Sequence, residues 1–186
     1  STHSCIHAKR IFRIGIFIIV RTQIMKNYTQ DELKKIYSAR REKLLAYMTE
    51  HGITAAVFED CEERRNPAVR YFTGHPTDAL FIIASNGKCA LIPWDENLAK
   101  ERAVDVQILP YNKYERRNTR ATKEVLKSFK IKGSRLKVEL PPTTPYPLFL
   151  QYVDALDGWD VLCREHSTHD FVVQMRSTKD EYEIEC

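Results

Sequence analysis

Two six-residue runs made almost wholly of apolar residues, ITAAVF at 53–58 and ALFIIA at 79–84, constrain the fold most. Such short apolar runs are typical of strands that are covered on both faces of a sheet. Asn86-Gly87 follows the second run and predicts a two-residue hairpin to an antiparallel strand at residues 88–92. Further strands are predicted at residues 106–109, 136–140 and 160–163.

Helical patterns separate most of these runs. Thr29 and Glu32 form a capping box that opens a helix, and Gly52 ends it. Four more helices are predicted: one capped by Asp95, one over residues 121–129, one with Thr144 as N-cap and Pro145 at its first position, and one starting near His169. Strands joined by helices imply parallel pairs, and the hairpin adds antiparallel ones. We therefore expect an α/β domain with a mixed sheet of about six strands and helices on both faces.

Length and cysteine usage narrow the class of protein. A chain of 186 residues fits one domain, and no apolar run approaches the roughly 18 residues that span a bilayer. The five cysteines are an odd number, and no two of them form a CxxC pair. This pattern argues against a zinc ribbon or a disulfide framework and favours reduced thiols. We expect a cytoplasmic protein that does not bind a membrane.

The net charge of +4 does not indicate nucleic-acid binding. Residues 1–24 carry four basic side chains and no acidic one, so residues 25–186 hold 25 of each sign. A balanced body has no excess positive charge to hold a phosphate backbone. The charged runs Glu62–Arg65 and Arg116-Arg117 are interpreted as solvated surface.

Residues 1–24 are interpreted as an extension outside the core, and residues 25–186 as the domain. The apolar stretch Ile11–Val20 after Lys9-Arg10 is similar to a signal peptide but lacks a small-x-small cleavage site. A mitochondrial transit peptide and a strand around Ile16–Val20 are alternatives. We favour Met25 as the natural start, because the sequence becomes regularly patterned only after it.

Common catalytic motifs are missing from the sequence. It contains no GxxxxGK[ST], GxGxxG, GxSxG or HExxH motif. His166 and His169, with Asp170 beside them, are spaced for a shared metal on a helix, but Ser167-Thr168 marks the start of that helix and favours a structural role. Acidic neighbours are expected to raise the pKa of the Cys61 thiol, which is wrong for a nucleophile. The sequence predicts an α/β domain without a catalytic centre.

Three segments resemble a known family. NPAVRYFTGHP at 66–76 resembles the "RYFTG" region of the creatinase/prolidase amino-terminal domain. VQMRSTKDEYEI at 173–184 resembles the junction at which that domain passes into the catalytic one, and RREKLL at 40–45 fits the family's opening helix. The order and separation of these segments give a resemblance over about residues 30–186.

The resemblance implies a fold and a parent enzyme. Family members are Xaa-Pro aminopeptidases, Xaa-Pro dipeptidases and creatinase. Their amino-terminal domain is a ribonuclease-H-like α/β sandwich that supports dimers or tetramers and covers the active site. The carboxyl-terminal "pita-bread" domain of the peptidases holds two metal ions, usually manganese, cobalt or zinc, through two Asp, one His and two Glu. These ligands would lie beyond Cys186, so the resemblance assigns no cofactor, metal ligand or catalytic residue to the present sequence.

Three functions follow as hypotheses. The leading one is a non-catalytic domain of an Xaa-Pro metallopeptidase, which covers the active site, contacts its own carboxyl-terminal catalytic domain and supports a homo-oligomer. Whether the parent enzyme is an aminopeptidase or a dipeptidase stays open. The reading frame is expected to continue past Cys186. The second is a stand-alone binding protein that lacks the peptidase half. The third, an enzyme of ribonuclease-H type, needs clustered carboxylates at strand ends. Glu59-Asp60 follows the first strand, but no matching acid directly ends the second or third.

One loop is predicted to be the functional edge of the domain. The segment from residue 70 to residue 78 should emerge at a strand end, where binding residues concentrate. It carries a guanidinium for a carboxylate, a titratable imidazole and two further polar groups. The predicted substrate- or partner-facing residues are Arg70, Tyr71, His75 and Asp78. The alternative is that Tyr71 is core, Gly74 a turn residue and Arg70 a surface cation.

Overall fold

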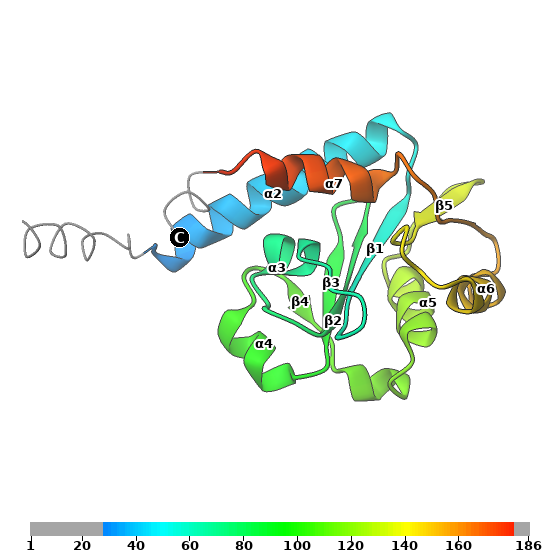
Figure 1. The fold of residues 1–186 in the computed structure, drawn as a ribbon, viewed down its shortest axis with the longest axis horizontal. Coiled ribbons are helices and arrows are strands. Elements are labelled where there is room, and N and C mark those ends of the chain that lie inside the picture. Colours follow the sequence, from blue (N-terminus) through cyan, green and yellow to red (C-terminus); the bar gives the residue numbers. More distant parts are fainter. Residues whose placement is uncertain (1–27, 181–186) are drawn as a thin grey trace, which may run out of the picture. The chain divides into compact units, whose positions relative to one another are not determined.

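A six-stranded sheet in the order β4-β3-β2-β1-β5-β6 runs through the protein in the computed structural model, which describes residues 28–180 (Figure 1). The central pairs β1–β2 and β2–β3 are antiparallel, and the outer pairs β3–β4, β1–β5 and β5–β6 are parallel. The strands are β1 Ala55–Asp60, β2 Ala79–Ala84, β3 Cys89–Pro93, β4 Gln107–Ile108, β5 Leu136–Glu139 and β6 Trp159–Leu162. The predicted mixed sheet is confirmed.

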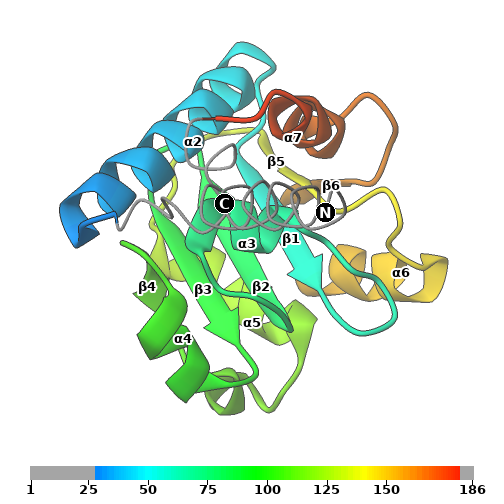
Figure 2. The same cartoon turned by 60° about the vertical axis from the view of Figure 1, so that its left-hand side comes forward.

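Helices cover both faces of the sheet (Figure 2). Apolar side chains of α5 and α6 pack on one face, and those of α2, α3, α4 and α7 pack on the other. The helices are α2 Gln30–Glu50, α3 Ala68–Thr73, α4 Glu96–Arg102, α5 Asn118–Ser128, α6 Tyr146–Ala155 and α7 Thr168–Ser177, and a 3-10 turn, η1, spans Tyr111–Tyr114. Two separate apolar cores result, one on each side of the sheet.

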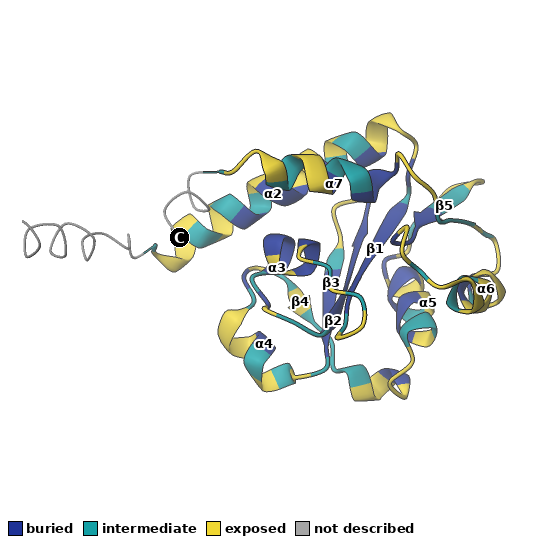
Figure 3. Ribbon diagram, in the orientation of Figure 1, coloured by how far each residue is buried: buried dark blue, intermediate teal, exposed yellow. Residues whose placement is uncertain are grey.

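β2 is apolar throughout because both of its faces are covered, whereas β1 lies two residues later than the predicted 53–58 and ends in Glu59 and Asp60. Along β2, Leu80 and Ile82 enter the core under α5 and α6, while Phe81 and Ile83 enter the core under α2 and α3. Every residue of β2 is buried, as is every residue of β1 (Figure 3). Side chains alternate between the faces of a strand, so two covered faces favour a nearly continuous apolar run, and the two buried carboxylates at the end of β1 each bind an arginine or backbone amides.

The hairpin between β2 and β3 is one residue longer than predicted. The Ala84 amide donates to the Lys88 carbonyl at 2.9 Å, which leaves a three-residue loop of Ser85, Asn86 and Gly87. Gly87 has φ +86°, and its amide donates to the Ala84 carbonyl at 2.9 Å. A turn followed by a left-handed glycine is the usual three-residue alternative to the two-residue hairpin, and an Asn-Gly pair fits both.

Helix starts were predicted with mixed success. The capping box of Thr29 with Glu32 is confirmed, as is the Asp95 cap of α4. The predicted N-cap Thr144 is wrong: its hydroxyl donates to the Pro141 carbonyl at 2.7 Å, and Pro145 takes the N-cap position. A hydroxyl next to a turn has a local carbonyl to bind as an alternative to the helix amides.

Three further observations complete the fold. β4 pairs over two residues where the sequence predicted a strand over 106–109. None of the helices within residues 28–180 is long and apolar enough to cross a membrane. The extension at residues 1–24 and the end of the junction motif lie outside the described residues.

Candidate functional site

The segment predicted as a loop, residues 70–78, begins inside α3: its first four residues are helical, and Gly74 ends the helix. Its φ is +77°, and its amide donates to the Arg70 carbonyl at 2.8 Å. A Cβ added at Gly74 would lie 2.7 Å from the Arg102 carbonyl oxygen. Both the left-handed backbone and the close approach require glycine at this position.

Two buried arginines of α2 hold the carboxyl end of α3. Arg40 donates through Nη1 to the Tyr71 carbonyl at 2.9 Å, and its guanidinium lies 4.2 Å from the centre of the Tyr71 ring. Arg41 donates to the Phe72 carbonyl at 3.1 Å and forms a 2.9 Å ion pair with Asp105. The last carbonyls of a helix lack intrahelical partners and carry partial negative charge, so the two cations satisfy and stabilise them.

Asp60, the last residue of β1, binds both the loop that follows β1 and the loop that precedes β2. Its Oδ1 accepts from the Asn66 amide at 2.6 Å, and its Oδ2 accepts from the Asp78 amide at 3.2 Å. Arg65 lies 3.5 Å from Oδ2 of Asp60 and donates to Oδ1 of Asp78 at 2.9 Å, with a further contact to Thr77. Because one carboxylate binds two backbone amides and an arginine, Asp60 fixes the loop geometry.

His75 is fully buried within this loop. Neither ring nitrogen has a well-formed hydrogen bond within residues 28–180. Burial lowers the pKa of His75, while the Thr77 backbone and the nearby carboxylates, including Asp95 and Asp60, oppose the shift. The ring is therefore held neutral near neutral pH and does not reach solvent.

The structure brings only two of the four predicted site residues together. His75 and Asp78 lie together at the Asp60 edge, where Arg65 also binds. Tyr71 is buried under α2, and Arg70 is exposed on α3. The roles of Asp60 and Arg65 in holding the loop were not predicted; the signal in the sequence was the acidic pair Glu59-Asp60, which was expected to follow the first strand and forms its last two residues.

Glu59 lies on the opposite face of β1 from Asp60, because neighbouring side chains of a strand alternate. It forms a 2.6 Å ion pair with Arg64. Glu59 also raises the pKa of the buried Tyr152, although burial is the main cause. The two adjacent carboxylates do not form the clustered pair that ribonuclease-H chemistry needs.

The surroundings of the histidines and of Cys61, which the sequence also singled out, favour structural roles over catalytic or metal-binding ones. The His169 ring is buried 4.6 Å from the Phe58 ring, and its Nε2 lies 3.4 Å from the Glu139 carbonyl oxygen, whereas His166 is exposed. Desolvation lowers the pKa of His169 to about 4. The pKa of Cys61 is raised as expected, mainly by burial and then by Glu59. Within residues 28–180 no group of three or more His, Cys, Asp or Glu side chains is placed to hold a metal.

These features define an α/β domain with helices on both faces of a mixed sheet and a strand-end loop tied down by a buried carboxylate. The sequence model of the creatinase/prolidase N-terminal domain matches residues 40–159, and the chain belongs to that family. The match contains both arginines that hold α3, the whole predicted loop and five complete strands. No curated protein sequence matched the chain.

Solved structures share the fold at low sequence identity. An Xaa-Pro aminopeptidase from Streptococcus pyogenes is 18% identical with a TM-score of 0.57, and the match covers 74% of this chain and 98% of that one. A dipeptidase, PepE, from Mycobacterium ulcerans is 17% identical with a TM-score of 0.58, covering 81% and 39%. A prolidase from Thermococcus sibiricus is 19% identical with a TM-score of 0.52, covering 80% and 39%. The chain thus spans about two fifths of the dipeptidase and prolidase chains.

Proposed function

We propose that this chain is the non-catalytic amino-terminal domain of a metal-dependent Xaa-Pro peptidase. The observation that carries the proposal is the family match over residues 40–159. The structural neighbours described as an Xaa-Pro aminopeptidase, a dipeptidase and a prolidase support it. We further propose a cytoplasmic homo-oligomer, in which the domain contacts its own catalytic domain.

The chemistry belongs to the proposed catalytic domain. Two divalent ions, manganese, cobalt or zinc, would activate a water molecule and polarise the carbonyl before proline. The residues described here show no cluster that fits such an ion pair, so none of them is assigned as a ligand. This domain would cover the active site and so restrict which substrates reach the metals.

Within this domain, the segment from residue 70 to residue 78 is proposed to face the catalytic cleft of the same or a neighbouring subunit. Arg70 is the exposed member and is suited to bind a substrate or partner carboxylate. His75 and Asp78 would instead hold the loop in position, because His75 is buried inside it and Asp78 forms an ion pair with Arg65. Arg70 is therefore a contact residue, and the other two are positioning residues.

The test uses the protein encoded by the complete reading frame. With manganese added, we expect it to hydrolyse Xaa-Pro peptides, whereas residues 28–180 alone should not. Arg70→Ala should lower kcat/KM about tenfold or more without changing the melting temperature. Arg102→Ala, an exposed arginine on α4, is the matched control and should behave as wild type.

Two results would count against the proposal. Unchanged kcat/KM, KM and oligomeric state in Arg70→Ala would make the loop structural. A reading frame that stops close to Cys186 would remove the peptidase and leave the stand-alone binding protein as the function.

A further inference from the structure

The balanced charge of the body conceals a strong segregation along the sequence. Residues 113–137 carry ten basic and two acidic side chains, a net charge of +8. The rest of the body, residues 25–112 and 138–186, carries 15 basic and 23 acidic side chains, a net charge of −8. One short stretch, which includes α5, therefore holds all the excess positive charge of residues 25–186.

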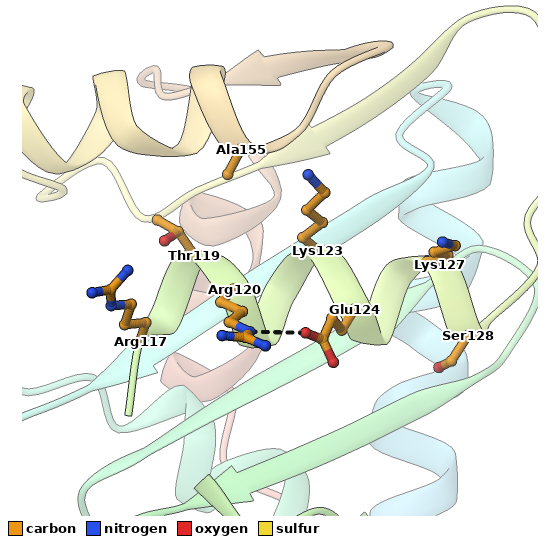
Figure 4. Close-up of a pocket in the computed structure, with 8 residues that line it drawn as sticks. All are labelled: Arg117, Thr119, Arg120, Lys123, Glu124, Lys127, Ser128 and Ala155. Atoms are coloured by element: carbon orange, nitrogen blue, oxygen red, sulfur yellow. Dashed lines mark hydrogen bonds and ion pairs between the residues drawn. The ribbon is translucent and has the colours of Figure 1, made fainter. Parts of the chain in front are cut away.

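The cations of α5 gather on one exposed strip. Arg120, Lys123 and Lys127 follow a spacing of three or four residues and so share a face of α5, and one further cation flanks each end of the helix. We call this strip the α5 basic surface; it consists of Arg117, Arg120, Lys123, Lys127 and Lys130, all exposed. The first four line a shallow hollow of about 750 Å³ between α5 and Ala155 of α6 (Figure 4).

An apolar floor adjoins the cations. Lys123, Lys127 and Lys130 also border a second hollow of about 320 Å³. Its other lining residues include the apolar side chains of Leu126, Ile131, Leu136, Leu156 and Trp159. Asp157 also lines this hollow, so the surface combines a rim of three lysines and one carboxylate with a place for apolar side chains.

Most of this positive charge is not neutralised locally. Arg120 forms an ion pair with Glu124 at 3.0 Å and a second one with Glu115. Lys123 and Lys127 form no ion pair within residues 28–180, although they lie four residues apart on the helix. Like charges at this spacing destabilise a helix by a few tenths of a kcal/mol. The spacing of Lys123 and Lys127 therefore does not itself stabilise α5, although Lys127 in the last turn interacts favourably with the helix dipole.

We propose that the α5 basic surface binds an acidic amphipathic protein segment. Its carboxylates would pair with the lysines, and its apolar side chains would enter the second hollow beside Trp159. A nucleic acid fits less well, because a phosphate backbone has no use for an apolar floor and the surface has one aromatic ring rather than a row of stacking platforms. Glu124 also lies in the middle of the strip, where it would interrupt a track for consecutive phosphates. The proposal is independent of peptidase activity.

The experiment measures fluorescence anisotropy of a labelled peptide with repeated Glu-Glu-Leu-Phe units, titrated with the full chain at low salt. We expect binding that the double variant Lys123→Glu/Lys127→Glu weakens by about tenfold or more. Lys34→Glu/Lys43→Glu on α2 makes the same charge change on the other side of the sheet and should leave affinity within about twofold. Trp159→Ala should weaken peptide binding although it leaves the charge of the protein unchanged. Circular dichroism would check the folding of each variant.

Three outcomes would overturn the proposal. One is that the wild-type chain does not bind the peptide. Another is equal weakening by the α2 control, which would show a general effect of net charge. The third is tighter binding of labelled oligouridine than of the peptide, which would assign the surface to nucleic acid.

Discussion

At the scale of single residues, Gly74 has the least freedom in the predicted loop. Its positive φ and the Arg102 carbonyl oxygen, which would lie 2.7 Å from an added Cβ, are separate penalties. We expect Gly74→Ala to lower the free energy of unfolding by about 2 kcal/mol or more, of which about 1–2 kcal/mol is left-handed strain. Urea unfolding would measure the loss.

Gly87→Ala is the matched control for that substitution. Gly87 has a similar φ of +86°, but an added Cβ would meet nothing within 4 Å. The free energy of unfolding of Gly87→Ala should therefore fall only by the left-handed strain, about 1–2 kcal/mol. Equal losses in the two variants would mean that the crowding against Arg102 is relieved by a small backbone shift.

The sequence predicted that residues 70–78 emerge at a strand end, but it did not predict the surroundings of their side chains. It singled out His75 as a donor or acceptor at the surface, whereas the folded loop encloses the ring completely. It could not separate Arg40 and Arg41 from ordinary surface cations, because their partners, the carbonyls of Tyr71 and Phe72, are 31 residues away. Burial of a charged side chain depends on such distant contacts, which no local pattern reports.

At the scale of elements, α7 carries a buried histidine that makes its docking depend on pH. Glu139 accepts from the Thr168 amide at 2.7 Å at the start of α7, and the neighbouring His169 ring is buried. Because the pKa of His169 is lowered to about 4, the folded ring stays neutral where the unfolded ring, with a pKa of about 6.5, binds a proton. This difference removes stability as pH falls from about 6.5 towards 4.

We therefore expect acidification from pH 7 to pH 4.5 to cost the wild type about 2 kcal/mol more unfolding free energy than it costs His169→Phe. Urea unfolding at both pH values gives the comparison, and each protein serves as its own reference for any loss from the substitution itself. His166→Phe, an exposed histidine three residues earlier, should keep the wild-type dependence. A His169→Phe variant with an unchanged pH dependence would contradict the assignment.

Elements in the middle of the fold were the most predictable ones. β2 has the predicted bounds, 79–84, because a strand covered on both faces leaves an unbroken apolar run. The edge strand β4 shrank to two residues, since an edge has one neighbour and a weak sequence signal. The capping box of Ser167 with Asp170 at α7 was not predicted in full, although its serine marked the helix start.

At the scale of the whole molecule, residues 1–24 are predicted to add nothing to the stability of the core. The stretch has no acidic residue, and the first described helix begins with its own capping box at Thr29. Deleting residues 1–24 should leave the melting temperature, followed by circular dichroism, within about 2 °C of that of the full chain. A large fall would show that Ile11–Val20 belongs to the folded core.

The sheet joins neighbouring and distant parts of the chain in unequal ways. β1, β2 and β3 form two antiparallel pairs through short connections, whereas β5 reaches β1 across 83 residues, with the Thr54 amide bound to the Lys137 carbonyl at 2.9 Å. Closing a longer loop loses more chain entropy, by about 0.6 kcal/mol for each doubling, and such contacts slow folding. During synthesis, the first three strands leave the ribosome well before β5 exists. The antiparallel centre of the sheet can therefore form as the chain emerges, whereas the parallel pairs with β5 and β6 must wait for the second half of the sequence.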